Sequence, residues 1–378
     1  MQTTAASSEY TEERVLFLAL ELSNSSWKLG STVGMGQKPR QRTIKAGDLL
    51  ALHEEISQAK SRFGLSSSAR VVSCYEAGRD GFWLDRHLRE GGIENIVVDP
   101  SSVEVNRRRR RAKTDRLDVE KLLRQLMRWW GGEKEVWSVV HVPSVEEEDQ
   151  RQLHRELESL KSERTRHTNR MTSLLITQGI RLKVNRDFLV RLNKVRLWDG
   201  SPLPMGLRDR LEREYLRWVL VQEQIAELEK QRRVALRTAE NPGTETASQL
   251  YLLRGIGENY AWLASMEFFG WRKFGNRRQV GGLSGLAPTP FCSGSLHREQ
   301  GIGKDGNRRI RAMTIEIAWG WLRFQPDSEL TKWFNQRYGA ASRRSRRVGI
   351  VALARKLLVE LWRYLETGVI PEGAVLKS

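Results

Sequence analysis

The fold of the N-terminal part is decided by one stretch, Val15-Leu16-Phe17-Leu18-Ala19-Leu20-Glu21-Leu22-Ser23-Asn24-Ser25-Ser26-Trp27-Lys28-Leu29-Gly30. Residues 15–20 form a short, uninterrupted apolar run, which is typical of a buried β-strand. Residues 26–30 alternate in polarity and follow a Ser-Asn-Ser turn, so the two segments predict a β-hairpin.

Strand-like and helix-like segments continue to alternate up to about residue 145. Further strands are expected at residues 71–75 and 96–98, and residues 139–142 are the last candidate strand. Phe82, Leu84 and Leu88 suit a helix that ends at Gly91-Gly92. This alternation predicts an α/β domain with a mixed sheet over residues 1–145.

The middle of the chain has a different periodicity. Apolar residues recur at a/d-like spacings in two segments: Leu153, Leu157, Leu160, His167, Met171 and Leu174, then Leu211, Trp218, Val221, Ile225 and Leu228. A cluster of helix breakers, residues 199–204, separates them. We predict two long helices over residues 146–247 that form an antiparallel hairpin or coiled-coil arm.

The last part, residues 248–378, predicts a mostly α-helical domain, so the fold class is α/β plus α. Apolar residues share a helix face in two segments: Ile310, Met313, Ile317 and Trp321, and Ile350, Ala354, Leu357 and Leu361. The domain starts with Leu253-Arg254-Gly255-Ile256-Gly257, which is typical of the hairpin of a helix-hairpin-helix that binds a DNA phosphate. The alternative interpretation is a helix cap.

Charge indicates the class of partner. The chain has 378 residues, with 64 Lys and Arg against 46 Asp and Glu, which gives a net charge of +18. An acidic polymer is the expected partner of such a chain. Cys74 and Cys292 lie far apart, which argues against a disulfide scaffold or zinc finger and favours the cytoplasm. No apolar run reaches the ~18 residues of a membrane span, so no membrane partner is expected.

Four acidic residues occupy positions where α/β proteins gather ligands. Glu21 and Glu76 end predicted strands, and Asp115 and Asp118 lie three residues apart where a helix begins. Four hard oxygen ligands suit one or two Mg²⁺ ions acting at a phosphate. The alternatives are ordinary solvated acids for the two glutamates, and a helix cap with a first-turn acid for the two aspartates.

Basic residues concentrate in three places. We expect them to bind nucleic acid through phosphate contacts and counterion release. They are Arg107, Arg108, Arg109, Arg110, Arg111 and Lys113 beside the aspartate pair; Lys304, Arg308, Arg309 and Arg311 at a Gly-rich loop and helix start; and Arg343, Arg344, Arg346 and Arg347. The alternative for each group is a solvated charged face.

A Pro-fixed turn precedes the Gly-rich loop and carries Ser293-Gly294. A serine beside a phosphate-binding loop is able to attack phosphorus if a base or metal removes its proton. The alternative for a lone Ser-Gly is a simple turn, and the spacing alone favours the turn.

Together these motifs resemble the insertion sequence one-ten family of transposases, also called DEDD transposases, and within it the eleven-eleven subgroup. The resemblance spans nearly the whole chain and is carried by Leu20-Glu21-Leu22-Ser23, Tyr75-Glu76-Ala77-Gly78, Lys113-Thr114-Asp115-Arg116-Leu117-Asp118, Gly285-Leu286-Ala287-Pro288 through Ser293-Gly294, and Gly306-Asn307-Arg308-Arg309. Glu21 stands where the family has Asp; it remains a hard oxygen ligand, one methylene longer.

The resemblance implies a RuvC-like N-terminal domain of RNase-H-type fold, with Glu21, Glu76, Asp115 and Asp118 as its Mg²⁺-binding tetrad. It implies that Ser293 forms a covalent phosphoserine link when DNA is cut. It also implies a structured bridge RNA that pairs with donor and target DNA, dimers that pair into a tetramer, and action at the bacterial nucleoid.

Two rival hypotheses remain open at this point. A RuvC-like nuclease that resolves branched DNA with metal-activated water needs the four acids and not Ser293. A non-catalytic nucleic-acid-binding protein needs only the basic segments and the helical arm.

Overall fold

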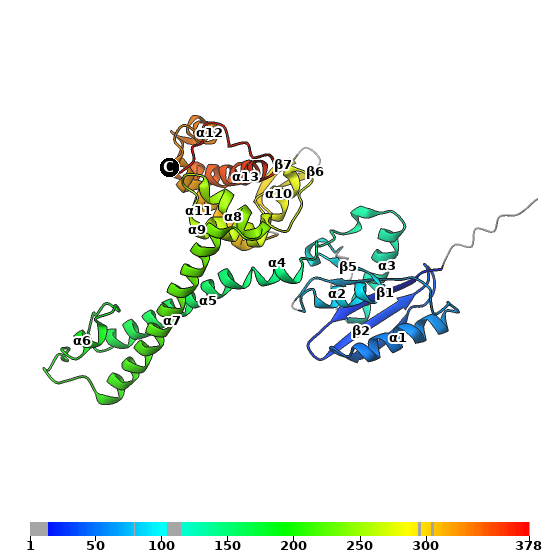
Figure 1. The fold of residues 1–378 in the computed structure, drawn as a ribbon, viewed down its shortest axis with the longest axis horizontal. Coiled ribbons are helices and arrows are strands. Elements are labelled where there is room, and N and C mark those ends of the chain that lie inside the picture. The colour runs from blue at the N-terminus through cyan, green and yellow to red at the C-terminus, as the bar shows by residue number, and fades with distance from the viewer. Residues whose placement is uncertain (1–13, 79, 104–114, 294–295, 304–305, 378) are drawn as a thin grey trace, which may run out of the picture. The chain divides into compact units, whose positions relative to one another are not determined.

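The computed structural model describes residues 14–78, 80–103, 115–293, 296–303 and 306–377, and gives the backbone only for residues 101, 115–117, 289–293 and 296–300. The chain divides into two compact units, Met1–Pro143 and Ser144–Ser378. Figure 1 shows a sheet with its helices in the first unit, and a long helical hairpin with a helical domain in the second. The predicted three-part division of the chain stays a prediction.

The first unit is built on a five-stranded mixed sheet of order β3-β2-β1-β4-β5. Its strands are β1 (Leu16–Leu22), β2 (Ser26–Thr32), β3 (Arg40–Lys45), β4 (Val71–Glu76) and β5 (Glu94–Val98). β1 pairs antiparallel with β2 and parallel with β4, as the hairpin pattern and the mixed sheet predicted. β3 extends the hairpin at the edge, where its largely polar residues gave no apolar alternation.

Alternation along β1 sorts its side chains between two cores. Leu16, Leu18 and Leu20 pack with α1 (Leu49–Arg62) and α2 (Trp83–Glu90) on one face. Phe17 and Ala19 pack with α3 (Asp115–Trp130) on the other face. The sheet is therefore a middle layer between helices, and this is why its central strands read as continuous apolar runs.

The candidate strand at residues 139–142 was wrong. Val139 makes a single antiparallel bridge to Val98, and Val140 and Val142 pack against the α1–α2 core. Pro143, which has no N–H to donate to a ladder, ends this segment. Two 3₁₀ turns complete the unit, η1 (Pro100–Ser102) and η3 (Lys134–Val136).

The second unit begins with α4 (Val145–Asp149) and contains the predicted helical hairpin, formed by α5 (Gln152–Ile176) and α7 (Met205–Thr238) (Figure 1). Later residues of α5 contact earlier residues of α7: Lys161 pairs with Glu229 at 2.7 Å, and His167 bonds to Glu214 at 2.7 Å. The helices are therefore antiparallel. A small apolar cluster around α6 (Phe188–Leu192) closes the far end.

The remaining elements belong to a mostly helical region whose main core holds the predicted helix faces, including Ile310, Trp321, Leu357 and Leu361. They are α8 (Pro242–Leu252), α9 (Glu258–Ala264), the π-helical turn η4 (Ser265–Phe269), α10 (Arg277–Leu283), β6 (Pro288–Ser293), β7 (Leu296–Ile302), α11 (Arg308–Phe324), α12 (Glu329–Tyr338) and α13 (Arg343–Thr367). None of the helices in the described part of the chain is both long and apolar enough to cross a membrane.

Candidate functional site

Glu21 and Glu76 lie side by side near the carboxyl ends of the central strands β1 and β4. We refer to this side of the sheet, where these two strands end, as its carboxyl-terminal edge. The parallel register pairs Leu20 with Tyr75, so the next residues on the two strands, Glu21 and Glu76, are neighbours. Ala19 and Cys74, two residues earlier on each strand, face α3. Because side chains alternate along a strand, both glutamates belong to the α3 face of the sheet.

The direction of α3 brings its first turn toward the same edge. Its last residue, Trp130, lies 5.2 Å from the guanidinium of Arg70, which precedes β4, so the end of α3 is at the opposite edge. Near its start, Val119 lies against Gly30, where an added Cβ would come 2.2 Å from the Val119 Cγ1. The helix therefore runs antiparallel to β1, and its beginning, with Asp115 and Asp118, points toward the glutamates.

We call Glu21, Glu76, Asp115 and Asp118 the acidic edge. Carboxylates are hard-oxygen ligands of the kind that Mg²⁺ takes, and the predicted metal site of these four residues stays a prediction. Within the described residues, no three Asp, Glu, His or Cys side chains are grouped so that they could hold a metal ion, and the Asp115 side chain is not among those described. Burial, and then the nearby Glu76 carboxylate, raise the pKa of the Cys74 thiol, so Cys74 stays neutral.

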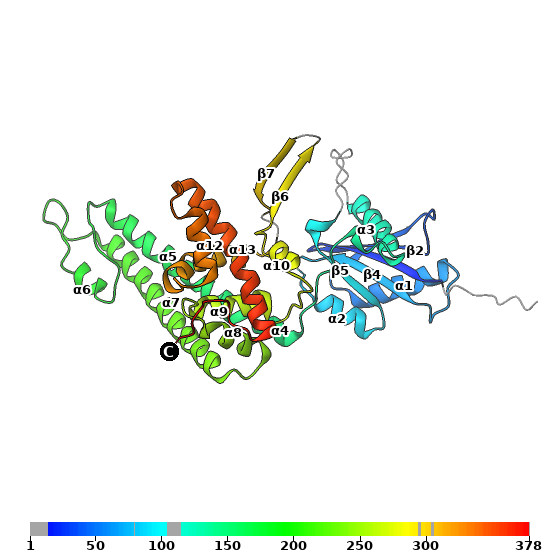
Figure 2. The same cartoon turned by 90° about the horizontal axis from the view of Figure 1, so that it is seen from above.

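Ser293 is the last residue of β6 and pairs with Leu296 at the start of β7. It therefore lies at the tip of a two-stranded hairpin, which Figure 2 shows extending away from α10 and α13. The base of the hairpin is anchored, because the Gly303 N–H donates to the Ala287 carbonyl at 2.9 Å and Ile302 packs on the core.

The Gly306-Asn307-Arg308-Arg309 motif has a structural role after the hairpin. Gly306 has φ +87°, and a Cβ there would lie 2.2 Å from the Leu283 carbonyl oxygen, so only glycine allows the chain to pass α10. The Asn307 side chain then caps α11 by accepting from the N–H groups of Arg309 and Ile310 at 3.0 and 3.1 Å. The motif thus fixes where α11 begins.

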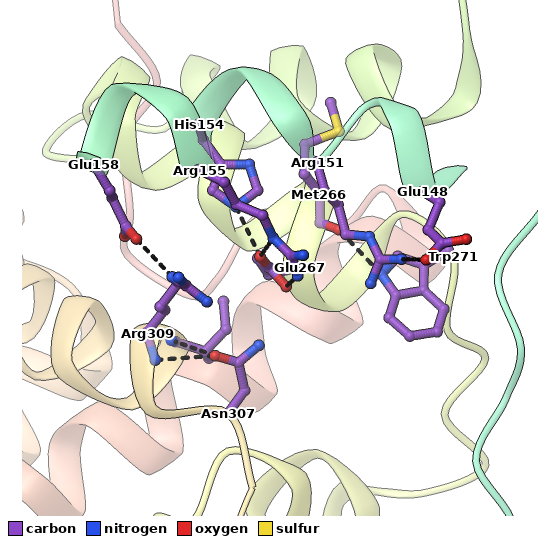
Figure 3. Close-up of polar contacts among 11 residues, drawn as sticks. Glu148, Arg151, His154, Arg155, Glu158, Met266, Glu267, Trp271, Asn307 and Arg309 are labelled. Carbon is purple, nitrogen blue, oxygen red and sulfur yellow. Dashed lines mark hydrogen bonds and ion pairs between the residues drawn. The ribbon is translucent and has the colours of Figure 1, made fainter. Parts of the chain in front are cut away.

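The base of the helical arm is tied to the C-terminal core by ion pairs (Figure 3). Glu267 of η4, whose side chain is only 5% exposed, accepts from His154 at 2.8 Å and from Arg155 at 2.9 Å. Burial raises the pKa of the Glu267 carboxyl, but the bonds from His154 and Arg155 outweigh it and hold the pKa at about 2. Glu158 of α5 pairs with Arg309 at 2.6 Å.

The sequence did not predict these ion pairs. His154 and Glu267 are 113 residues apart, and Glu158 and Arg309 are 151 residues apart. Only the fold brings each pair together. Arg309 was predicted to bind nucleic acid; the structure gives it a partner within the chain, and nucleic-acid binding by this residue stays a prediction.

The other predicted basic residues are placed as follows. Arg308 is exposed and Arg311 is half-buried on α11. In the first turns of α13, Arg343, Arg344 and Arg347 are exposed, while Arg346 donates to the Gly339 carbonyl at 3.4 Å. Those that lie outside the described residues are Arg107, Arg108, Arg109, Arg110, Arg111, Lys113 and Lys304.

The predicted helix-hairpin-helix segment is a turn between α8 and α9 with Gly255 at φ +90°. The C-terminal segment pairs with this turn: Leu253 bridges to Leu376, and the Arg254 N–H donates to the Val375 carbonyl at 3.1 Å. Burial lowers the pKa of Lys377, whose ammonium donates to the Ile256 carbonyl, to about 8. The turn is therefore partly occupied by the chain itself.

Comparison with known proteins gives the family. Residues 247–332 match the family described as Transposase IS116/IS110/IS902 family. The chain is 42% identical over 378 residues to the putative transposase y4rJ of Sinorhizobium fredii, covering 96% of this chain and 95% of that protein. It is 25% identical over 331 residues to the transposase for insertion sequence element IS1328 of Yersinia enterocolitica, covering 86% and 92%.

The class of protein is therefore a transposase. The chain belongs to the IS116/IS110/IS902 transposase family, which is the insertion sequence one-ten family that its motifs resemble.

Proposed function

We propose that this transposase, encoded by an insertion sequence, cuts and rejoins donor and target DNA in the cytoplasm, at the nucleoid. In the proposal the first unit is a RuvC-like domain of RNase-H-type fold, and its acidic edge holds one or two Mg²⁺ ions. The observation that carries it is the placement of Glu21 and Glu76 on neighbouring parallel strands, with the first turn of α3 directed toward them.

Ser293 is the proposed nucleophile. Its Oγ attacks the phosphorus of a DNA phosphodiester, the Oγ proton passes to a base, and the bond from phosphorus to the leaving strand breaks as that strand's oxygen takes up a proton. The phosphoserine ester keeps the bond energy, so a hydroxyl of the new strand attacks its phosphorus without ATP. The bond from phosphorus to the Ser293 Oγ then breaks, and the Oγ regains a proton. The chain accordingly has no GxxxxGK[ST] run. Mg²⁺ at the acidic edge would neutralise the phosphate charge and activate the attacking oxygen.

Two further partners belong to the proposal. A structured bridge RNA pairs with donor and target DNA and supplies sequence choice, which suits a chain with a net charge of +18. The protein assembles as a dimer of dimers. The four acids belong to the first compact unit and Ser293 to the second, and the proposal lets the acids of one subunit serve Ser293 of another.

The test is a recombination assay with purified protein, Mg²⁺, RNA transcribed from the sequence flanking the gene, and both DNAs. We expect Ser293→Ala and Asp118→Asn to abolish strand transfer. The matched controls are Ser295→Ala, two positions further along the sequence, and Glu94→Gln, an exposed acid on β5 that pairs with Arg70; both should retain activity. Recombination by the Ser293→Ala protein would overturn the nucleophile assignment.

The same assay separates the rival hypotheses. Cleavage of branched DNA by Ser293→Ala, with no protein–DNA adduct, would favour a nuclease that uses water. Full DNA affinity with no chemistry in Mg²⁺ would favour a binding protein.

A further inference from the structure

A basic pocket lies beside the strand that leads to Ser293. Its volume is about 560 Å³, and it is formed by α10, by the segment that enters β6, and by α13. Five of its lining residues are cationic: Arg277, Arg278, Arg355, Lys356 and Arg363. None of these five is among the residues that the sequence predicted to bind nucleic acid.

The charge of this pocket is poorly balanced within the chain. Glu360 is the one acidic residue that lines it, and its Oε1 already accepts from Arg363 at 2.8 Å. Among the described residues, Arg277, Arg278 and Arg355 have no ion-pair partner. Three guanidinium groups around one hollow repel one another, so the pocket is most stable with an anion bound.

The backbone explains why these side chains come together. Gly281 of α10 has no side chain, and a Cβ there would lie 3.7 Å from the Arg355 Cδ, so α10 packs closely along the Arg355 stem. On α13, Arg355 and Arg363 are separated by two steps of four residues and share a helix face. Lys356 lies 4.7 Å from the centre of the Trp333 ring, which holds its ammonium at the edge of this face.

The position of the pocket indicates which anion it binds. Ala287 and Pro288 line it, and Pro288 begins the strand that ends at Ser293. Five strand steps span about 17 Å. Successive phosphates of one B-DNA strand are about 3.4 Å apart along the axis, so this span corresponds to about five base pairs.

We propose that this pocket binds the phosphate backbone of duplex DNA about five base pairs from the bond that Ser293 cuts. The proposal rests on the proposed DNA cleavage for the position of the contact. Guanidinium groups bind phosphate oxygens in pairs without reading bases, so the pocket holds the duplex in place and does not select its sequence.

The test measures DNA affinity as a function of salt in the Ser293→Ala background with EDTA in place of Mg²⁺, so that neither the proposed serine chemistry nor a metal-dependent nuclease cuts the probe. The probe is a labelled duplex that carries the end of the element and its flank. We expect Arg278→Gln/Arg355→Gln to lower the slope of log affinity against log salt by about 2, because each lost phosphate contact removes about one unit. The control Arg323→Gln/Arg337→Gln, which removes two exposed charges from the same unit, should change the slope by less than half as much.

Two further measurements locate the contact and check folding. Ethylation of phosphates about five base pairs from the cut should weaken binding to the parent protein and not to the double variant. Arg278→Lys/Arg355→Lys, which keeps both charges, should restore most of the slope. The proposal is overturned if the double variant matches its control, if ethylation interference is unchanged, or if only RNA binding falls. Because binding is measured without Ser293 and without Mg²⁺, the result can be interpreted even if the cleavage proposal fails.

Discussion

Replacing Glu267 by glutamine tests the link between the helical arm and the C-terminal core. The folded protein lowers the pKa of this carboxyl from an ordinary value of 4.5 to about 2. Each pKa unit corresponds to about 1.4 kcal/mol, so the ionised carboxylate contributes about 3 kcal/mol of stability at pH 7. The group is buried beneath α5, and solvent screens this contribution little.

The sign of the pH dependence follows from the depressed pKa. The contribution of Glu267 is complete above pH 4.5 and is lost as the pH falls through about 2. Glu267→Gln removes it at every pH. The difference in stability between parent and variant should therefore fall to roughly half its neutral value by pH 3.

The assay is thermal unfolding followed by circular dichroism at several pH values. For a unit of this size, 1 kcal/mol shifts the midpoint by about 2–4 °C, so Glu267→Gln should lower Tm by roughly 6–12 °C at pH 7. The control is Glu223→Gln, an exposed acid on α7, which should change stability by less than about 0.5 kcal/mol. Equal Tm values for the Glu267 and Glu223 variants, or a difference that does not depend on pH, would refute the reasoning.

Three other predictions concern close packing and burial. Gly306→Ala places a Cβ against the Leu283 carbonyl at φ +87° and should cost about 1–3 kcal/mol in thermal unfolding, whereas Gly282→Ala, which meets nothing within 4 Å, should be neutral or stabilising. Gly30→Ala forces Val119 and the start of α3 away from the sheet, so this variant should lose both DNA cleavage and stability. The control Gly34→Ala places its Cβ in open space and should lose neither. Equal cleavage activity of the two variants would contradict the proposed placement of the acidic edge. In a Cys292→Ser background, the buried Cys74 should not react with a thiol reagent at pH 8 until the protein is unfolded, and rapid labelling of the native protein would contradict its burial.

Sequence reasoning recovered the elements whose signal is local. The apolar run at residues 15–20 and the alternation after it gave the β1–β2 hairpin, and the a/d spacing gave the paired helices α5 and α7. It did not recover β3, because an edge strand of mostly exposed polar residues carries no alternation of apolar side chains. It over-extended residues 139–142 into a strand, because apolar side chains that pack singly resemble a short strand.

The candidate site likewise has a part that the sequence predicts and a part that it does not. Strand ends and a helix start were visible in the sequence, and the register of β1 and β4 makes Glu21 and Glu76 neighbours. The ion pairs of Glu267 and Glu158 and the basic pocket depend on residues far apart in the chain. No local pattern encodes such contacts, because they are set by how helices pack and not by spacing.

The most direct test of the central claim is to find the atom that carries the DNA. Protein, Mg²⁺, RNA and DNA are mixed, quenched in detergent and digested with trypsin, and peptide 279–298, which contains Ser293, is analysed by mass spectrometry. We predict a nucleotide linked through phosphate to Ser293, absent when Asp118 is replaced by asparagine. Cleaved DNA with free ends and no adduct, or an adduct on Ser284 or Ser295 of the same peptide, would contradict the proposed mechanism.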